Sequence, residues 1–158
     1  MEDLEKDLVY MGSALALAQK AQSIDEVPVG AIVVLDDEVI GEGWNQPIST
    51  HDPTAHAELI AIRQAANRIG NYRLLGTVMY VTLEPCCMCV GAMIHARIRR
   101  LVYAAPDLKT GAVSSAFNLL SAKSHNHAIE VSAGVLEVEC SQILSEFFSQ
   151  LRKKPRRC

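Results

Sequence analysis

The chain has 158 residues, of which 49% are hydrophobic and 21% are charged, and its formal net charge is −3. This length allows one domain with a substantial core but not two independent ones, and the composition excludes a disordered or fibrous protein. No apolar run reaches the roughly 20 residues that cross a bilayer, and the five cysteines follow no signal peptide, so a membrane protein or a disulfide scaffold is not expected. We expect a single domain over residues 1–158 and a location in the cytoplasm.

The first elements predicted along the chain are a helix and a β-hairpin. Apolar residues recur at three- and four-residue steps over 3–22, which is typical of one face of an amphipathic helix. Two β-rich runs then occupy 29–35 and 38–43, and the short polar break between them, Asp36-Asp37, is of hairpin type.

A buried helix, a buried strand and another helix are expected next. Asp52-Pro53 resembles an N-cap with proline at the first helical position, and the helix predicted over 55–69 has apolar residues on most sides. The near-continuous β-branched and apolar run 77–83 is typical of a strand covered on both faces. The following helix is expected to begin at Glu84-Pro85 and to run to about residue 96.

The remaining sequence predicts two strands and a C-terminal helix. The strands are expected over 99–104 and 129–131, with a turn at 109–111 between them. The final helix has an apolar stripe made of Leu136, Cys140, Ile143, Phe147 and Leu151. This succession of helices and strands predicts an α/β fold with a mixed sheet and helices on both faces.

A basic segment ends the chain from about residue 152, whereas the rest of the sequence is acidic overall. Residues 152–157 read Arg-Lys-Lys-Pro-Arg-Arg. Two interpretations remain open: the segment contacts phosphate groups, or it is a solvated and frayed terminus.

A candidate metal site consists of His56 in one apolar segment and of Cys86 and Cys89 in another. On a helix the two cysteines are three residues apart and share a face, whereas Cys87 projects elsewhere and is interpreted as a small buried hydrophobe. The preceding Pro85 indicates a helix N-terminus, where the partial positive charge favours thiolates. Two thiolates and one imidazole suit zinc with its fourth position open for water, as in a catalytic site.

Glu58 is the candidate proton carrier of this site. It lies two residues after His56, and on a regular helix the two side chains would point roughly 200° apart, so Glu58 is not expected to be an equivalent ligand. A catalytic zinc lowers the pKa of its water towards about 7, and a carboxylate then moves protons. Each residue also has a simpler interpretation, as a local hydrogen-bonding group or as a carboxylate beside the helix dipole. A closed structural zinc site is a further alternative, with a fourth ligand among Cys140, His51, His95, His125 and His127.

The combination of His-Ala-Glu with a later Pro-Cys-x-x-Cys is the signature of zinc nucleobase deaminases. Beyond this signature, the chain resembles the bacterial tRNA-specific adenosine deaminases, which belong to the zinc-dependent cytidine/deoxycytidylate deaminase superfamily. The matching segments span nearly the whole chain: they are 26–31, 41–45, 51–58, 71–74, 80–86, 88–94 apart from Val90, and Asp107 with 109–112. Cys87, Val90 and Pro106 differ from the residues that are common in the family.

The resemblance implies a fold, a cofactor and a reaction. The fold would be a three-layer α/β/α cytidine-deaminase-like fold with a central mixed sheet of about five strands. The protein would be a homodimer with one Zn²⁺ per subunit, held by His56, Cys86 and Cys89. It would convert adenosine to inosine at the wobble position of a tRNA anticodon, with Glu58 carrying the protons.

Substrate contacts are also implied by the resemblance. Asn45 would contact the flipped nucleotide, Val27 and Leu83 would line its pocket, and Asp107 would contact a neighbouring nucleotide. From their sequence context alone these would be turn or core residues. Flipping a base out of its stack is least costly in a loop, which an anticodon stem-loop supplies.

Two other functions are compatible with the zinc motif. A guanine deaminase, or another small-molecule nucleobase deaminase, shares the segment 52–58 and a Pro-Cys-x-x-Cys motif. A zinc-stabilised RNA-binding module would use the metal only for folding. Because substrate choice depends on contacts around the pocket, the segments 43–45 and 109–112 and the basic tail favour an RNA substrate.

Overall fold

Helices and strands are interspersed along residues 2–155, the part of the chain that the computed structural model describes. In order they are α1 (Glu2–Ser23), β1 (Gly30–Leu35), β2 (Glu38–Trp44), α2 (Pro47–Thr50), α3 (Ala57–Ile69), β3 (Val78–Leu83), α4 (Cys87–His95), β4 (Arg100–Ala105), the 3-10 turn η1 (Leu119–Ser121), β5 (Glu130–Ala133) and α5 (Glu137–Lys153). No helix among these is both long and apolar enough to cross a membrane.

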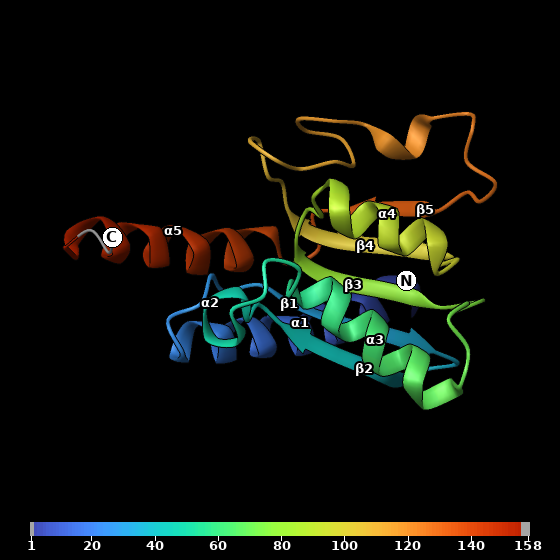
Figure 1. The fold of residues 1–158 in the computed structure, drawn as a ribbon, viewed down its shortest axis with the longest axis horizontal. Helices are drawn as coiled ribbons and strands as arrows, with labels where there is room; N and C mark the ends of the chain where they lie inside the picture. The colour runs from blue at the N-terminus through green and yellow to red at the C-terminus, as the bar shows by residue number, and fades with distance from the viewer. Residues whose placement is uncertain (1, 156–158) are drawn as a thin grey trace.

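The strands form one mixed sheet in the order β2-β1-β3-β4-β5 (Figure 1). β1 runs antiparallel to both β2 and β3, whereas β3, β4 and β5 are parallel to one another. The side chains of β1, β3 and β4 are buried almost throughout, because helices cover both faces at the centre of the sheet. The mixed sheet of five strands that the resemblance implied is thereby confirmed.

One face of the sheet is covered by α1 and α5, and the other by α3 and α4 (Figure 1). α3 packs on β1 and β2 at close range, since a Cβ atom at Gly43 of β2 would overlap the carbonyl oxygen of Ala57. A residue without a side chain therefore lets the start of α3 lie directly on the sheet. This arrangement confirms the three-layer α/β/α architecture.

The connection between β1 and β2 is a two-residue turn, as the pair Asp36–Asp37 predicts. Both residues have positive φ, 49° and 61°, and Leu35 pairs with Glu38. Two consecutive left-handed residues form a type I′ turn, whose twist matches that of the flanking strands. The Tyr10 hydroxyl donates a hydrogen bond to the carbonyl oxygen of Asp37 at 2.9 Å, which ties the turn to α1.

The second long helix begins at Ala57, so the prediction of an N-cap at Asp52 is wrong. The Asp52 carboxylate is occupied locally, because its Oδ1 accepts the Thr54 N–H at 2.8 Å and the Thr54 hydroxyl at 2.7 Å. His56 is the N-cap residue instead, with extended backbone angles of φ −75° and ψ 149°. The N–H of Ala57 is satisfied from another segment, since it donates to Asn45 Oδ1 at 2.9 Å.

A buried ion pair anchors α1 to the sheet through Asp7. Its carboxylate accepts two N–H groups of Arg100, at 2.9 and 2.7 Å, and the hydroxyl of Tyr80 at 2.7 Å. Burial raises the pKa of Asp7, but the bonds from Arg100 and Tyr80 outweigh this effect and hold the pKa below its ordinary value of 3.8. The carboxylate is therefore ionised at neutral pH and joins α1 to β3 and β4.

α5 is covered by the sheet only over its first half. Cys140 and Ile143 of the predicted apolar stripe are buried, whereas Leu151 is 49% exposed. The helix continues past the end of the strands, so that its C-terminal half projects beyond the sheet (Figure 1). The projecting half forms one side of a cleft.

Candidate metal centre and substrate cleft

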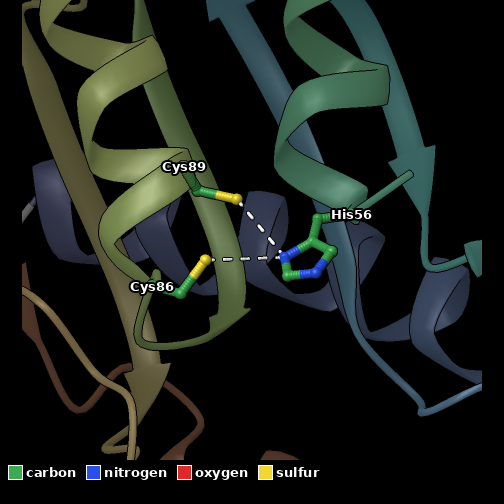
Figure 2. A group of neighbouring side chains, drawn as sticks. All are labelled: His56, Cys86 and Cys89. Atoms are coloured by element: carbon green, nitrogen blue, oxygen red, sulfur yellow. Dashed lines mark hydrogen bonds between the residues drawn. The ribbon is translucent and has the colours of Figure 1, made fainter. Parts of the chain in front are cut away.

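Two helix starts meet at His56, Cys86 and Cys89 (Figure 2). His56 is the N-cap of α3, Cys86 is the N-cap of α4, and Cys89 lies in the first turn of α4. The Nδ1 atom of His56 is 3.6 Å from the Cys86 Sγ and 3.5 Å from the Cys89 Sγ. The fold thus brings His56 together with two cysteines that lie 30 and 33 positions later in the sequence.

The spacing of these atoms fits a tetrahedral metal ion. Zinc lies about 2.3 Å from a thiolate and about 2.0–2.1 Å from an imidazole nitrogen, so a tetrahedral angle separates sulfur from nitrogen by about 3.5–3.6 Å. The distances of 3.6 and 3.5 Å agree with that value. The three side chains could hold a metal ion, and no other His, Cys, Asp or Glu among residues 2–155 joins them. The fourth ligands considered for a closed structural site, such as Cys140, are therefore not in this group.

The electrostatics of the group favour a thiolate at Cys86. Hydrogen bonds from the Cys89 thiol and from His56 lower the pKa of Cys86 to about 4, although burial opposes the shift. The pKa of His56 is raised, mainly because the imidazolium donates to Cys86. The hydrogen bond to Cys86, followed by burial, raises the pKa of the Cys89 thiol. At neutral pH the group therefore holds at least one ionised sulfur in the form that binds metal.

His56, Cys86 and Cys89 are called the metal group here, and Glu58 lies beside this group without being part of it. The residue is in the first turn of α3 and is only 4% exposed, and its carboxylate contacts the Cys89 thiol. Because His56 lies outside the regular helix, the angle of roughly 200° expected between the two side chains does not apply. Burial raises the pKa of Glu58, which makes the carboxyl group a better proton acceptor than an exposed glutamate.

Cys87 is exposed, so its interpretation as a buried hydrophobe is wrong. α4 begins at Cys87, one residue after the N-cap Cys86. The position is exposed in the first turn, whereas Cys89 and Val90 are buried. The middle of the motif therefore faces outward.

Asn45 connects the end of the hairpin to the metal group. Its side-chain oxygen accepts the Ala57 N–H, the first of α3, and Ala57 directly follows His56. The side chain is half-buried. With the oxygen engaged, the amide nitrogen remains as the donor that this residue can offer to another molecule.

The other three residues implied in substrate binding, Val27, Leu83 and Asp107, line one cleft of about 600 Å³. It lies between the loop 106–110 and the projecting half of α5, and its lining does not include the metal group. Asp107 has a local role as well, since its carboxylate accepts the N–H of Lys109 and of Thr110, both at 3.1 Å. Lys109 lies at the rim of the same cleft.

The basic tail begins beside this cleft. Arg152 lines it, and Lys154 Nζ is 3.7 Å from the Asp25 carboxylate. Arg156, Arg157 and Cys158 lie outside the described residues. The start of the tail is therefore close to the residues implied in substrate binding, and one of its lysines is paired with an acidic side chain.

Besides Asp7, two further buried carboxylates were not predicted from the sequence. Glu84 is 2% exposed and Glu26 is 1% exposed, and each accepts hydrogen bonds from backbone N–H groups of a surface segment. Burial raises the pKa of Glu84, but the bonds from the 107–115 loop, led by the Ser114 N–H, outweigh it and lower the pKa below its ordinary value. For Glu84, the available signal in the sequence was its position as a single acidic residue between the buried strand β3 and the helix α4.

The chain is similar to known deaminases over nearly its whole length. The family model described as MafB19-like deaminase matches residues 5–152. The tRNA-specific adenosine deaminase of Haemophilus influenzae is 53% identical over 153 residues, which are 96% of this chain and 88% of that protein. The enzyme of the same name from Bacillus subtilis is 42% identical over 153 residues, which are 97% of this chain and 95% of that protein.

Solved structures of deaminases share the fold of this chain. A chain from studies of A-to-I editing by tRNA:A34 deaminases is 47% identical, with a TM-score of 0.83, and the match covers 85% of this chain and 98% of that one. A guanine deaminase from Nitrosomonas europaea shares the fold with a TM-score of 0.75, at 24% identity over 90% of this chain and 84% of that one. By its fold, its motifs and its similarity to these relatives, the chain belongs to the family of bacterial tRNA-specific adenosine deaminases.

Proposed function

We propose that this protein deaminates adenosine to inosine at the wobble position of a tRNA anticodon. The observation that carries the proposal is the arrangement of His56, Cys86 and Cys89 with spacing that suits tetrahedral zinc, beside the buried carboxylate of Glu58. The curated relatives that are 53% and 42% identical are named for this tRNA activity, which supports the choice of substrate.

In the proposed mechanism, His56, Cys86 and Cys89 would hold one Zn²⁺ per subunit. When bound, zinc supplies Lewis-acid activation of a water molecule, whose pKa it lowers towards about 7. Glu58 takes one proton from the attacking water and delivers it to N1 of adenine as the water oxygen bonds to C6. Glu58 then takes the remaining proton of the added hydroxyl group and gives it to the departing amine, so that adenosine and water give inosine and ammonia. Its burial favours these transfers, because the raised pKa helps the carboxyl group to hold a proton between steps.

The cleft beside the loop 106–110 is proposed to receive nucleotides of the anticodon loop. Val27 and Leu83 offer apolar surface for a base, and Asn45 offers an amide donor next to the metal group. Lys109 and Arg152 at the cleft are positively charged, which suits the phosphates of an RNA backbone. The wobble base must leave its stack to reach the buried site, and an unpaired loop lowers that cost.

A deaminase of free guanine or another small nucleobase is the second candidate, because the guanine deaminase fold matches over most of the chain. The 24% identity of that match, against 53% and 47% for tRNA deaminases, makes it the weaker one. The two candidates differ in whether the substrate must be presented by RNA.

The deciding experiment offers three substrates to the purified, zinc-loaded protein. These are an anticodon stem-loop with adenosine at the wobble position, the same stem-loop with that adenosine moved by one position, and free guanine. Inosine formation, measured by mass spectrometry after digestion to nucleosides, is expected only in the first stem-loop. Turnover of guanine with none of the RNA would refute the proposal.

The whole chain is proposed to be one deaminase domain over 1–158 with a basic tail from about residue 152, acting in the cytoplasm as a homodimer. The outward face of α4 supports the homodimer, because its half-buried and exposed positions carry no Lys, Arg, Asp or Glu: they are Cys87, Met88, Gly91, Ala92 and His95. An uncharged helix face of this kind suits a self-complementary contact. Analytical ultracentrifugation of the protein and of Met88→Glu tests it, and a monomeric wild-type protein would contradict it.

A further inference from the structure

The carboxylate of Glu84 is the centre of a buried hydrogen-bond cluster that lacks a cationic side chain. Its Oε1 accepts the Asp107 N–H at 3.1 Å and the Ser115 hydroxyl. Its Oε2 accepts the N–H groups of Val113, Ser114 and Ser115 at 3.1, 2.9 and 3.0 Å. No ion pair of Glu84 is found among residues 2–155, so loop donors alone satisfy its charge.

The hydrogen-bond cluster of Glu84 joins the start of α4 to the wall of the cleft. Glu84 follows Leu83, which lines the cleft, and stands two residues before Cys86. The loop it gathers begins at Pro106, and residues 106–110 form one side of the cleft. A backbone bond reinforces the connection, because the Ala112 N–H donates to the Pro85 carbonyl at 2.8 Å.

On the loop side, the backbone of Gly111 lies directly against this carboxylate. A Cβ atom at Gly111 would overlap the carboxyl carbon of Glu84 and lie 2.6 Å from its Oε2. The loop therefore closes on the carboxylate itself. Helices and strands are absent between β4 and η1, so these bonds are the main backbone connections that the segment has to the rest of the fold.

We propose that Glu84 is a positioning residue that fixes the loop 106–115 against the start of α4 and thereby sets the affinity for the RNA substrate. The inference rests on the proposed function, because it takes this cleft to be the RNA site. A carboxylate can serve several converging N–H donors at once, whereas an amide has one oxygen and would direct its own N–H groups at them. Loss of the charge should therefore release the loop, while the metal ligands and Glu58 stay in place.

The test compares Glu84→Gln and Ser115→Ala with a matched control, Asp7→Asn. Asp7 is also a buried, multiply bonded carboxylate, but it lines a separate hollow at the other end of β3 that shares no residue with the cleft. For each variant we would measure zinc content, kcat and KM on the wobble-adenosine stem-loop. The Kd of the same RNA, measured by fluorescence anisotropy in a Glu58→Gln background, gives a readout that does not depend on turnover.

Glu84→Gln is expected to raise KM and Kd by about tenfold or more, with kcat within about threefold of wild type, because an interaction made equally in ground and transition states is lost. Ser115→Ala, which removes one donor, should raise both by about threefold. The control should lose stability without a change in KM. Zinc content should equal that of wild type in all three.

Unchanged KM and Kd in a folded, zinc-loaded Glu84→Gln would overturn the inference, and so would loss of zinc, which would assign the residue to the start of α4 alone. If Glu84→Gln does not fold, unchanged values in Ser115→Ala overturn it. A wild-type protein that binds the stem-loop but forms no inosine would instead refute the proposed function, leaving the Kd comparison to decide the role of Glu84.

Discussion

Replacement of Glu58 by glutamine separates a proton carrier from a carboxylate that only stabilises a helix start. Glutamine keeps the shape of the buried side chain but cannot take or give the proton. General acid–base groups contribute about 10²–10⁴-fold to rates, and Glu58 is proposed to serve both the attack and the departure of the amine. We therefore expect kcat to fall by at least about 10³-fold, with zinc content unchanged.

Glu58→Gln should change the free energy of unfolding in the opposite direction from the same replacement of a glutamate that only interacts with the helix dipole. A first-turn glutamate contributes about 0.3–1 kcal/mol through the dipole, and its neutralisation would lower the free energy of unfolding by that amount. Burial instead raises the pKa of Glu58 above the value of 4.5 expected in the unfolded chain. A carboxyl group whose pKa is higher in the folded than in the unfolded state favours folding while it is protonated. At pH values above both of these pKa values the group is ionised, and it then disfavours the folded state. At pH 7 the neutral glutamine should thus leave the metal-free protein at least as stable as the metal-free wild type.

The assay pairs single-turnover deamination of the stem-loop with urea denaturation of the metal-free protein at pH 7. Glu139→Gln is the matched control, since Glu139 is an exposed first-turn glutamate of α5 that lines no part of the substrate cleft. It should keep full activity and lose a little stability. Full activity of Glu58→Gln, together with a loss of stability like that of the control, would refute the assignment of Glu58 as the proton carrier.

Three further predictions follow from the fold and the metal group. Cys86→Ser should reduce bound zinc, measured by plasma mass spectrometry after dialysis, from one equivalent to almost none, whereas Cys87→Ser should retain it; equal retention would contradict the ligand assignment. Gly43→Ala should lower the free energy of unfolding by about 1–3 kcal/mol, because its methyl group overlaps the start of α3, while Gly12→Ala, which meets open space in α1, should raise it by about 0.5–1 kcal/mol. Asp7→Asn should cost about 3 kcal/mol at pH 7, the usual loss for a broken buried ion pair. Because the folded pKa of Asp7 lies below 3.8, this difference from wild type should persist down to pH 3.8 and shrink only as the pH falls further; a decrease between pH 7 and pH 5 would contradict the assigned pKa.

Local patterns were sufficient to predict most of the elements. The β-branched run of β3 and the Asp36–Asp37 break set strand positions and a turn that depend on nearest neighbours alone. The closeness of Cys86 and Cys89 was also predictable, because Pro85 and their spacing indicate a helix start with two sulfurs on one side. Such features are encoded within a few residues.

Features that depend on distant partners could not be predicted in this way. The bond from Ala57 to Asn45 spans 12 positions, and without it Asp52 is the more obvious N-cap. The donors that surround Glu84 come from 23 to 31 positions away, so its sequence neighbours do not reveal them. The exposure of Leu151 depends on where the sheet ends, which the periodicity of a helix does not report.

The placement of the metal group early in the fold bears on how the protein is made. All three ligand residues and Glu58 lie between positions 56 and 89, whereas β5 and α5 begin at Glu130 and Glu137. Ribosomes add about 5–20 residues per second, so the segment between Cys89 and α5 takes a few seconds to emerge. A nascent chain that binds zinc at these residues, as the proposed function requires, would gain the binding energy before its last helix exists. Supply of the metal during translation, and not only afterwards, would then affect how many chains reach the finished fold.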